Sequence, residues 1–177
     1  RFSHADETAS PGYYSVLLSD SRVRAELTAT QRTGMHKYTY PAGSKASLII
    51  DLHHGLGPDR VLSSEIRAVS DTEIVGFRRS AGWARDQCVY FVMRFSRPVA
   101  SLSIADGGTE SAVRSRKSAT GARARLGFGL ADETPLYVKV GISGVDIEGA
   151  RKNIDAENPG WDFEDVRARA AAAWRAQ

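Results

Sequence analysis

From Pro11 to Ser143 the sequence consists of short apolar runs that alternate with polar residues and are separated by turn residues. A period of two residues is typical of strands with one buried face, and this stretch has no long run of helical periodicity. The pattern predicts strands over 13–18, 23–30, 35–40, 46–52, 61–69, 73–79, 89–95, 99–104, 123–128 and 136–142. Turn signals such as Pro41-Ala42-Gly43 and Gly107-Gly108 separate them. The sequence therefore predicts an all-β fold, a two-sheet antiparallel β-sandwich.

The run at 23–30 shows the alternation clearly. One set of residues is small and apolar and the other is polar, namely Ala25, Leu27 and Ala29 against Arg24, Glu26 and Thr28. Successive side chains of a strand point to opposite faces of its sheet. We therefore expect the first set to face the core and the second set to face water.

After Ser143 the period changes to that of helices, and one or two C-terminal helices are expected. Ser143 and Asp146 are spaced as a capping pair ahead of a short helix over 145–157. Asn158-Pro159 then breaks this helix.

Asp162 is a predicted N-cap for a second helix over 163–177. An apolar stripe runs along it at steps of three and four residues: Phe163, Val166, Ala170, Ala173 and Trp174. The stripe is explained either by packing on the chain's own sandwich or by a linker that enters a second domain.

Chain length, net charge, cysteine content and hydropathy limit the classes of protein to which this sequence can belong. A chain of 177 residues suits one domain with a single core, and a formal net charge of +3 does not indicate nucleic-acid binding. The single cysteine, Cys88, excludes an internal disulfide, and no apolar run is long enough to span a membrane. One basic stretch lacks the aromatic residues that stack on bases, so we expect it on the solvent face of a sheet: Arg114, Arg116, Lys117, Arg123 and Arg125.

Three blocks of sequence carry a family likeness. Residues 2–41, which contain PGYYSV, AELTATQRTG and HKYTYP, resemble the N-terminal domains of glycoside hydrolase family 92. Residues 76–98 resemble the family's G-W-A-x-x-Q-x-V-Y-F block and the strand that follows it. Residues 136–174 are similar to the segment that connects this domain to the catalytic domain.

The resemblance implies a sandwich of the galactose mutarotase-like supersandwich type, followed in the whole enzyme by an (α/α)6 catalytic barrel. It implies a β-sandwich domain over 1–143 and a helical linker towards the barrel over 144–177. Because the chain begins with Arg1 rather than Met, we expect it to be a piece of a longer polypeptide. It then lacks the family's first segment, ahead of the FSH block, as well as the barrel.

The family's enzymes are secreted bacterial exo-α-mannosidases that are inverting and calcium-dependent. The resemblance places their acid, their base and their calcium site on the barrel. It therefore implies no catalytic residue, no metal and no cofactor in this chain, which is expected to be inactive alone. The implied partners are the barrel of the same polypeptide and, through the whole enzyme, mannose-containing glycans, but neither nucleic acid nor membrane. The implied location is secreted, periplasmic or on the cell surface.

Two residues are candidates for a carbohydrate or interdomain contact. Trp83 lies in a predicted loop, where an aromatic ring can stack on a sugar; the alternative is a loop anchor on its own sandwich. His4 stands in a polar triplet with Asp6 and Glu7 near the start of the chain, where a structural role is the alternative.

Other readings of the residues remain open. His53 and His54 are adjacent, so in a strand they point to opposite faces and do not easily bind one metal ion. The sandwich can be a supporting domain of a mannosidase, an autonomous carbohydrate-binding module, or a mutarotase-like enzyme. No convincing pair of histidine and carboxylate supports the last of these.

Overall fold

The computed structural model describes residues 1–55, 57–106, 109–130 and 134–176. The first half of the chain holds η1, a 3-10 helix (His4–Asp6), and the strands β1 (Glu7–Ser10), β2 (Tyr13–Leu17), β3 (Arg24–Ala29), β4 (Thr33–Thr39), β5 (Ala46–Asp51), β6 (Arg60–Ala68) and β7 (Glu73–Ala81). The second half holds β8 (Gln87–Phe95), β9 (Val99–Asp106), β10 (Thr109–Ser111), β11 (Ser115–Ser118), β12 (Arg123–Phe128), β13 (Leu136–Ser143), α1 (Ile147–Glu157) and α2 (Phe163–Arg175).

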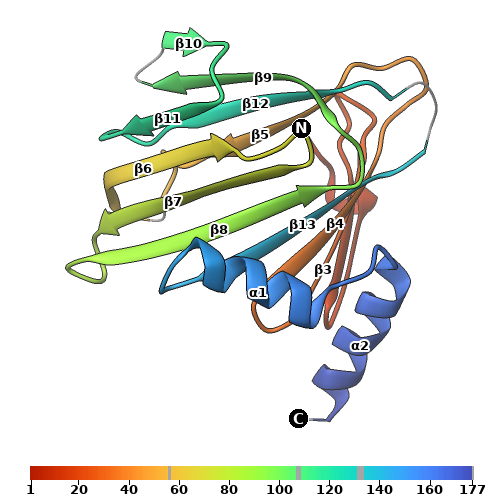
Figure 1. Ribbon diagram of the computed structural model, residues 1–177. Coiled ribbons are helices and arrows are strands. Elements are labelled where there is room, and N and C mark those ends of the chain that lie inside the picture. The colour runs from red at the N-terminus through yellow and green to blue at the C-terminus, as the bar shows by residue number, and fades with distance from the viewer. Residues whose placement is uncertain (56, 107–108, 131–133, 177) are drawn as a thin grey trace.

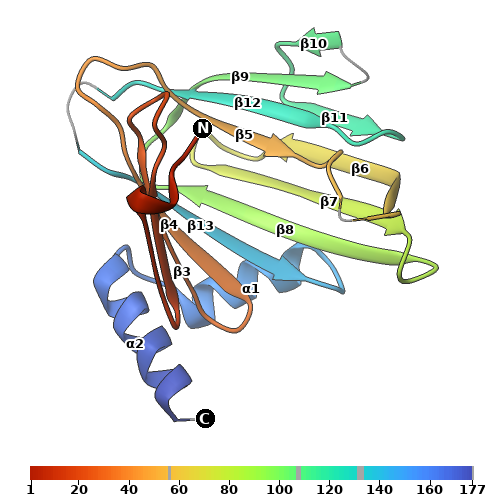
Figure 2. The same ribbon diagram turned by 180° about the vertical axis from the view of Figure 1, so that it is seen from behind.

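The strands form two antiparallel sheets that face each other (Figures 1 and 2). The larger sheet has nine strands in the order β1-β2-β3-β4-β13-β8-β7-β6-β11, and the smaller has four in the order β10-β9-β12-β5. The predicted two-sheet β-sandwich with C-terminal helices is therefore confirmed. The smaller sheet covers one face of the larger sheet, and α1 and α2 lie on the other face (Figure 1).

The main core fills the space between the sheets. Ile66 in β6, Leu136 in β13 and Leu126 in β12 are fully buried there. The rings of Phe95 and Phe128, one from each sheet, meet at 5.5 Å between centroids. Burial of apolar area on this scale is the main stabilising term of such a fold.

The polar face of β3 differs from the expectation. Glu26 and Thr28 are buried rather than exposed to water, because α2 lies across β2, β3 and β4. Their polar groups have partners: Oε1 of Glu26 accepts a hydrogen bond of 2.9 Å from Tyr13, and Lys37 lies 3.0 Å from Oε2. The hydroxyl of Thr28 donates to the Gly12 carbonyl at 2.7 Å. The expectation for the apolar set holds only in part, since Ala25 is buried, Leu27 is half-buried and Ala29 is exposed.

The first helix begins at Ile147, two residues later than predicted, and Ser143 and Asp146 do not act as a capping pair. Asp146 alone is the N-cap of α1, and its carboxylate accepts a hydrogen bond of 2.6 Å from the Gly149 amide. Ser143 instead accepts one from the Val145 amide at 3.0 Å. The helix buries Ala150 and Ile154 against the outer face of β7 and β8.

The second helix has the predicted N-cap, since Asp162 accepts a hydrogen bond of 3.0 Å from the Asp165 amide. Phe163, Val166 and Ala170 are buried against the sheet, and Phe163 and Val166 pack with Met35 of β4. The last turn of the helix does not continue this packing, because Ala173 and Trp174 are exposed. The apolar stripe is thus only partly used by the chain's own sandwich.

Three short strands, β1, β10 and β11, were not predicted. Their sequences, ETAS, TES and SRKS, contain almost no apolar residue, so their pairing with β2, β9 and β6 is not visible as an alternating pattern. The predicted turn at Gly107-Gly108 lies outside the described residues. Among the residues that the structure describes, neither helix has the length and apolar character needed to cross a membrane.

Candidate functional site

Trp83 lies at the tip of the β7–β8 hairpin and is 101 % exposed. The loop itself is well held, because Arg79 binds both carboxylate oxygens of Asp86 at 2.7 and 2.5 Å. Hydrogen bonds from Arg79 lower the pKa of Asp86, so this ion pair stays charged. Gln87 donates a hydrogen bond of 3.1 Å to Ser80 within the same hairpin. A firm hairpin therefore presents an aromatic ring that does not pack on its own sandwich.

His4 lies in η1, and its side chain is exposed. Its Nδ1 atom is 3.1 Å from Oε2 of Glu7, and Tyr14 donates a hydrogen bond of 2.9 Å to Oε1 of the same carboxylate. The hydrogen bonds from His4 and then Tyr14 lower the pKa of Glu7. Of the predicted triplet, only His4 and Glu7 are thus brought together.

The structure does not bring His4 and Trp83 into one site. Glu7, the partner of His4, pairs with Val16 on β2. Residues that pair in turn on β3, β4 and β13 lead across the sheet to Leu136, so His4 lies at the end of the sheet where β13 begins. The β7–β8 hairpin lies at the opposite end of the sheet, beside the end of β13 at Ser143 (Figure 1). Any role of these two residues is therefore separate.

Exposed apolar side chains gather at the hairpin end of the large sheet. We call Trp83, Val89, Ile142 and Val145 the apolar rim; the last three are 44, 47 and 78 % exposed. Val89, Ile142 and Val145 also line a hollow of roughly 630 Å³ at the β13–α1 connection. Only Trp83 was singled out from the sequence, because the other three look like ordinary strand and loop residues.

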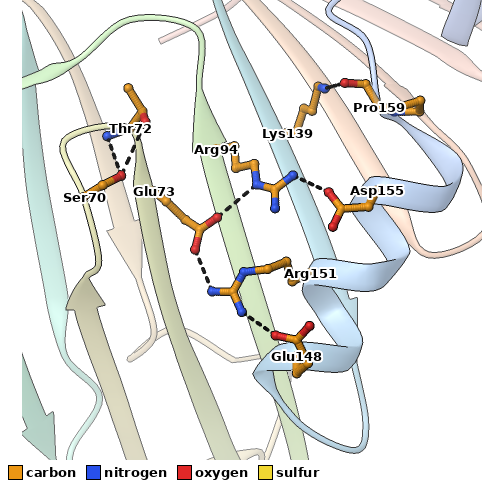
Figure 3. A network of polar contacts seen from close by, with 9 residues as sticks. All are labelled: Ser70, Thr72, Glu73, Arg94, Lys139, Glu148, Arg151, Asp155 and Pro159. Carbon is orange, nitrogen blue, oxygen red and sulfur yellow. Dashed lines mark hydrogen bonds and ion pairs between the residues drawn. The ribbon is translucent and has the colours of Figure 1, made fainter.

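A network of charged groups joins α1 to the large sheet (Figure 3). Glu73 of β7 accepts hydrogen bonds from Arg94 of β8 at 3.0 Å and from Arg151 of α1 at 2.6 Å. Arg94 also donates to Asp155 at 2.5 Å, and Arg151 to Glu148 at 2.7 Å. Burial acts against the charge of Glu73, but the hydrogen bonds from Arg151 and Arg94 outweigh it, so the pKa is lowered. No sequence motif pointed to this network.

Lys139 of β13 lies close to this network but does not belong to it. Its side chain is only 2 % exposed, and its ammonium donates a hydrogen bond of 2.9 Å to the Pro159 carbonyl (Figure 3). The same ammonium lies 4.2 Å from the centroid of the Trp161 ring. Burial, and then the charge of Arg94, lower the pKa of Lys139 to about 8.

The basic stretch is divided between the two sheets. Arg116 and Lys117 lie on β11 of the large sheet, whereas Arg123 and Arg125 are exposed on β12 of the small sheet. Arg123 lies 3.1 Å from Asp51 on the neighbouring β5. The stretch was expected on the solvent face of one sheet, and it is instead shared by two.

The adjacent histidines also have local partners. Asp51 accepts hydrogen bonds from the backbone amides of His53 and His54 at 2.8 and 3.1 Å. Nδ1 of His53 lies 2.5 Å from the Thr120 carbonyl. Within the described ranges, no group of three or more histidine, cysteine, aspartate or glutamate side chains could hold a metal ion.

Comparison with known proteins identifies the family of this chain. Residues 1–143 match the family model described as the glycosyl hydrolase family 92 N-terminal domain. An uncharacterized secreted glycosidase of Arthroderma benhamiae is 24 % identical over 196 residues, which cover 94 % of this chain and 24 % of that protein.

Solved structures show the same relationship. The family GH92 α-mannosidase BT3965 from Bacteroides thetaiotaomicron is 32 % identical with a TM-score of 0.90, and the match covers 98 % of this chain and 24 % of that one. The GH92 family glycosyl hydrolase ccman5 is 27 % identical with a TM-score of 0.88, and the match covers 99 % of this chain and 25 % of that one. The chain spans about a quarter of the length of these relatives. It belongs to glycosyl hydrolase family 92, and its residues 1–143 are the family's N-terminal domain.

Proposed function

We propose that this chain is the non-catalytic N-terminal domain of a secreted, calcium-dependent, inverting exo-α-mannosidase. In this role it supports an (α/α)6 catalytic domain of the same polypeptide and helps to shape the cleft that admits mannose-containing glycans. The helices over 144–177 form the linker between the two domains. The relatives support this proposal, because BT3965 is an α-mannosidase and this chain corresponds to about a quarter of its length.

The apolar rim is the observation that carries the proposal. Exposed apolar side chains that line one surface, as Val89, Ile142 and Val145 do, mark a place that another protein surface covers. Trp83 and Val145 are the most exposed members, at 101 and 78 %. At the same end of the sheet, Trp174 of α2 lines a second hollow with Thr30 and Gln31 of the β3–β4 turn. A catalytic domain that follows α2 can cover these surfaces together.

The titratable groups support a non-catalytic role. A glycosidase needs a carboxylic acid whose pKa is raised, so that it can protonate the leaving oxygen. In the part of the chain that the structure describes, each carboxyl group with a shifted pKa has a lowered one: Glu7, Asp51, Asp59, Glu73, Asp86, Asp106 and Glu157. Such values suit ion pairs and hydrogen bonds that hold a structure.

The described residues do not fit a calcium site, since they offer no group of three or more carboxylate, histidine or cysteine side chains. Calcium takes six to eight oxygen ligands, usually with several carboxylates among them. We therefore assign calcium binding, together with the catalytic acid and base, to the catalytic domain.

Activity measurements on two polypeptides test the proposal. The purified chain should release no mannose from α-mannosides above the buffer background, with or without calcium, whereas the whole polypeptide should release it. Release of mannose by the chain alone, or a natural gene product that ends at Gln177, would contradict the proposal.

Substitutions at the rim test the supporting surface within the whole polypeptide. Ile142→Asp and Val145→Asp should lower activity and thermal stability, because a charge cannot be buried without a partner. Ile49→Asp is the matched control, since Ile49 is 67 % exposed on the outer face of the small sheet, beside Arg125. Equal effects at all three positions would show that the apolar rim is not the surface that the catalytic domain covers.

The alternative is an autonomous carbohydrate-binding module, and the full exposure of Trp83 is the observation that favours it. Exposed aromatic rings on rigid loops can stack on sugar rings. Titration of mannose or α-mannobiose into the purified chain separates the two functions. Millimolar or tighter binding that Trp83→Ala abolishes would favour the binding module.

A further inference from the structure

Lys139 occupies the junction at which both helices meet the large sheet. On one side, α1 packs Ala150 and Ile154 on Val75 and Val92. On the other side, α2 packs Phe163 and Val166 on Met35. Lys139 lies between these clusters, because its neighbours across the ladder are Met35 on β4 and Arg94 on β8. The turn that joins the helices, residues 158–161, passes over its side chain and supplies its partners (Figure 3).

A buried ammonium is costly unless a carboxylate or several acceptors compensate for the loss of water. Among the described residues, its hydrogen bond goes to the Pro159 carbonyl and the Trp161 ring lies over it, while the charge of Asp155 acts on it only from a distance. Asp155, the nearby carboxylate, binds Arg94 instead. A well-packed apolar residue at this position would avoid the cost, so stability alone does not explain the lysine.

The contacts of Lys139 are directed at one short segment. The Pro159 carbonyl follows Asn158, the C-cap of α1, and Trp161 precedes Asp162, the N-cap of α2. The side chain therefore binds the turn at two points, between the end of one helix and the start of the next. A desolvated cation held against an aromatic face stabilises the arrangement in which the two groups meet, and so favours one conformation of the turn.

We propose that Lys139 is a positioning residue, whose ammonium clamps the turn at Pro159 and Trp161 and thereby fixes the direction in which α2 leaves the sandwich. The clamp is a property of this chain and can be measured on it alone. Its consequence for a second domain, that α2 leads the polypeptide away at a fixed angle, rests on the proposed function.

Hydrogen exchange of the purified chain tests the clamp at neutral pH. In Lys139→Met, amides in residues 158–163 should exchange about tenfold faster, as expected for the loss of a cation–π contact. Amides of α1 should keep their protection, and the melting temperature should not fall, because the buried charge is removed. Lys139→Arg should retain most of the protection, because a guanidinium can also lie on the ring.

A role in general stability predicts a different result. In that case Lys139→Met lowers the melting temperature and speeds exchange in α1 and in the turn alike. That outcome, or unchanged exchange at the turn, would overturn the proposal. Because neither measurement involves mannosides or a second domain, the clamp can fail while the proposed function stands, and the reverse also holds.

A pH titration tests the clamp without changing Lys139. The charged and titratable groups around it are Arg94 on β8, Glu73 on β7, Asp155 and Arg151 on α1, Tyr137 on β13, and on the α2 side Lys37 with Glu26 and Glu164. The pKa of Lys139 is about 8 and those of Arg94 and Arg151 are raised, so the cation that is lost near pH 8 is that of Lys139.

The reporter is Trp161 in the background Trp83→Phe, Trp174→Phe, which leaves it as the sole tryptophan of three. Its fluorescence should change with a midpoint near pH 8, and exchange at the turn should quicken over the same range. The same background with Lys139→Met should show no such transition. A flat titration with Lys139 present, or an unaltered transition without it, would refute the clamp.

Discussion

Arg151 of α1 donates a hydrogen bond of 2.6 Å to Glu73 of β7, although 78 positions of sequence separate them. The other oxygen of the same carboxylate accepts a hydrogen bond of 3.0 Å from Arg94 of β8. One half-buried carboxylate therefore ties the helix that follows the sandwich to two central strands of the large sheet. The attachment of α1 depends on this ion pair as well as on apolar packing.

The first prediction is that Glu73→Gln lowers the free energy of unfolding by about 1–3 kcal/mol, because two half-buried arginines lose their shared carboxylate. Chemical denaturation monitored by circular dichroism measures this change. Glu148→Gln is the control: its carboxylate is largely exposed and pairs with Arg151 at the helix surface, so its loss should cost less than about 0.5 kcal/mol. Equal costs for the two variants would contradict the assignment.

The same carboxylate gives the wild-type chain a dependence on acid. The pKa of Glu73 is lowered in the folded state from the ordinary value of 4.5, so the unfolded chain binds the proton first as the pH falls. Its stabilising contribution is complete above that value and is lost as the pH falls through the folded pKa. Glu73→Gln should therefore flatten the decline of stability below about pH 4.5.

The second prediction concerns the close approach of α1 to β13. A Cβ atom on Gly141 would lie 2.4 Å from the Ala150 carbonyl oxygen and 2.6 Å from Cγ1 of Ile154. Gly141→Ala should push α1 away from the sheet and lower the free energy of unfolding by about 1–3 kcal/mol, as overpacking does. Gly129→Ala is the matched control, since no atom lies within 4 Å of the corresponding Cβ. Thermal denaturation of both variants measures the difference.

The sequence predicted those features of the fold whose causes lie within a few neighbouring residues. Alternation within β3 predicted the strand, because that signal is contained in six consecutive residues. The burial of Glu26 was not predicted, since it depends on α2, which lies far along the chain. For the same reason β11 was missed: only its pairing with β6 makes SRKS a strand.

The residues of the candidate site also fall into those that the sequence predicted and those that only the structure shows. Trp83 was found because it stands within a recognisable block of sequence and in a loop. Lys139 alternates with Val138 and Val140 and looks like an ordinary solvent-facing strand residue, so only the packing of two helices shows that it is buried. Ile142 and Val145 look like core or helix-flanking residues, and only the structure shows that both are exposed.

The third prediction concerns His36, whose pKa is lowered by burial in β4 from the ordinary value of 6.5. The unfolded chain therefore takes up a proton before the folded chain does, and stability should fall as the pH falls below 6.5. The slope from one such group is at most about 1.4 kcal/mol per pH unit. Denaturation between pH 5 and 7 measures it.

Two variants separate burial from hydrogen bonding at this histidine. His36→Gln should remove the slope, because no proton is then taken up. Tyr38→Phe deletes the hydroxyl that lies 3.0 Å from Nδ1 but keeps the edge-to-face contact between the two rings, so the slope should remain. If Tyr38→Phe abolishes the slope, the hydroxyl rather than burial sets the pKa of His36.

The fourth prediction distinguishes what Trp83 does in the chain from what it does in the whole polypeptide. Its side chain is fully exposed at the hairpin tip, so Trp83→Ala should change the unfolding free energy of the isolated chain by less than about 0.5 kcal/mol. In the whole polypeptide the same change should lower kcat/KM for an α-mannoside or the melting temperature, because an aromatic contact with the catalytic domain or the substrate is lost. A loss of about tenfold in kcat/KM corresponds to one such contact.

Trp83→Phe, which keeps an aromatic ring on the same firm loop, should retain much of the activity. If the whole polypeptide with Trp83→Ala keeps both its kinetics and its melting temperature, the ring contacts neither partner, and the rim must act through Val89, Ile142 and Val145.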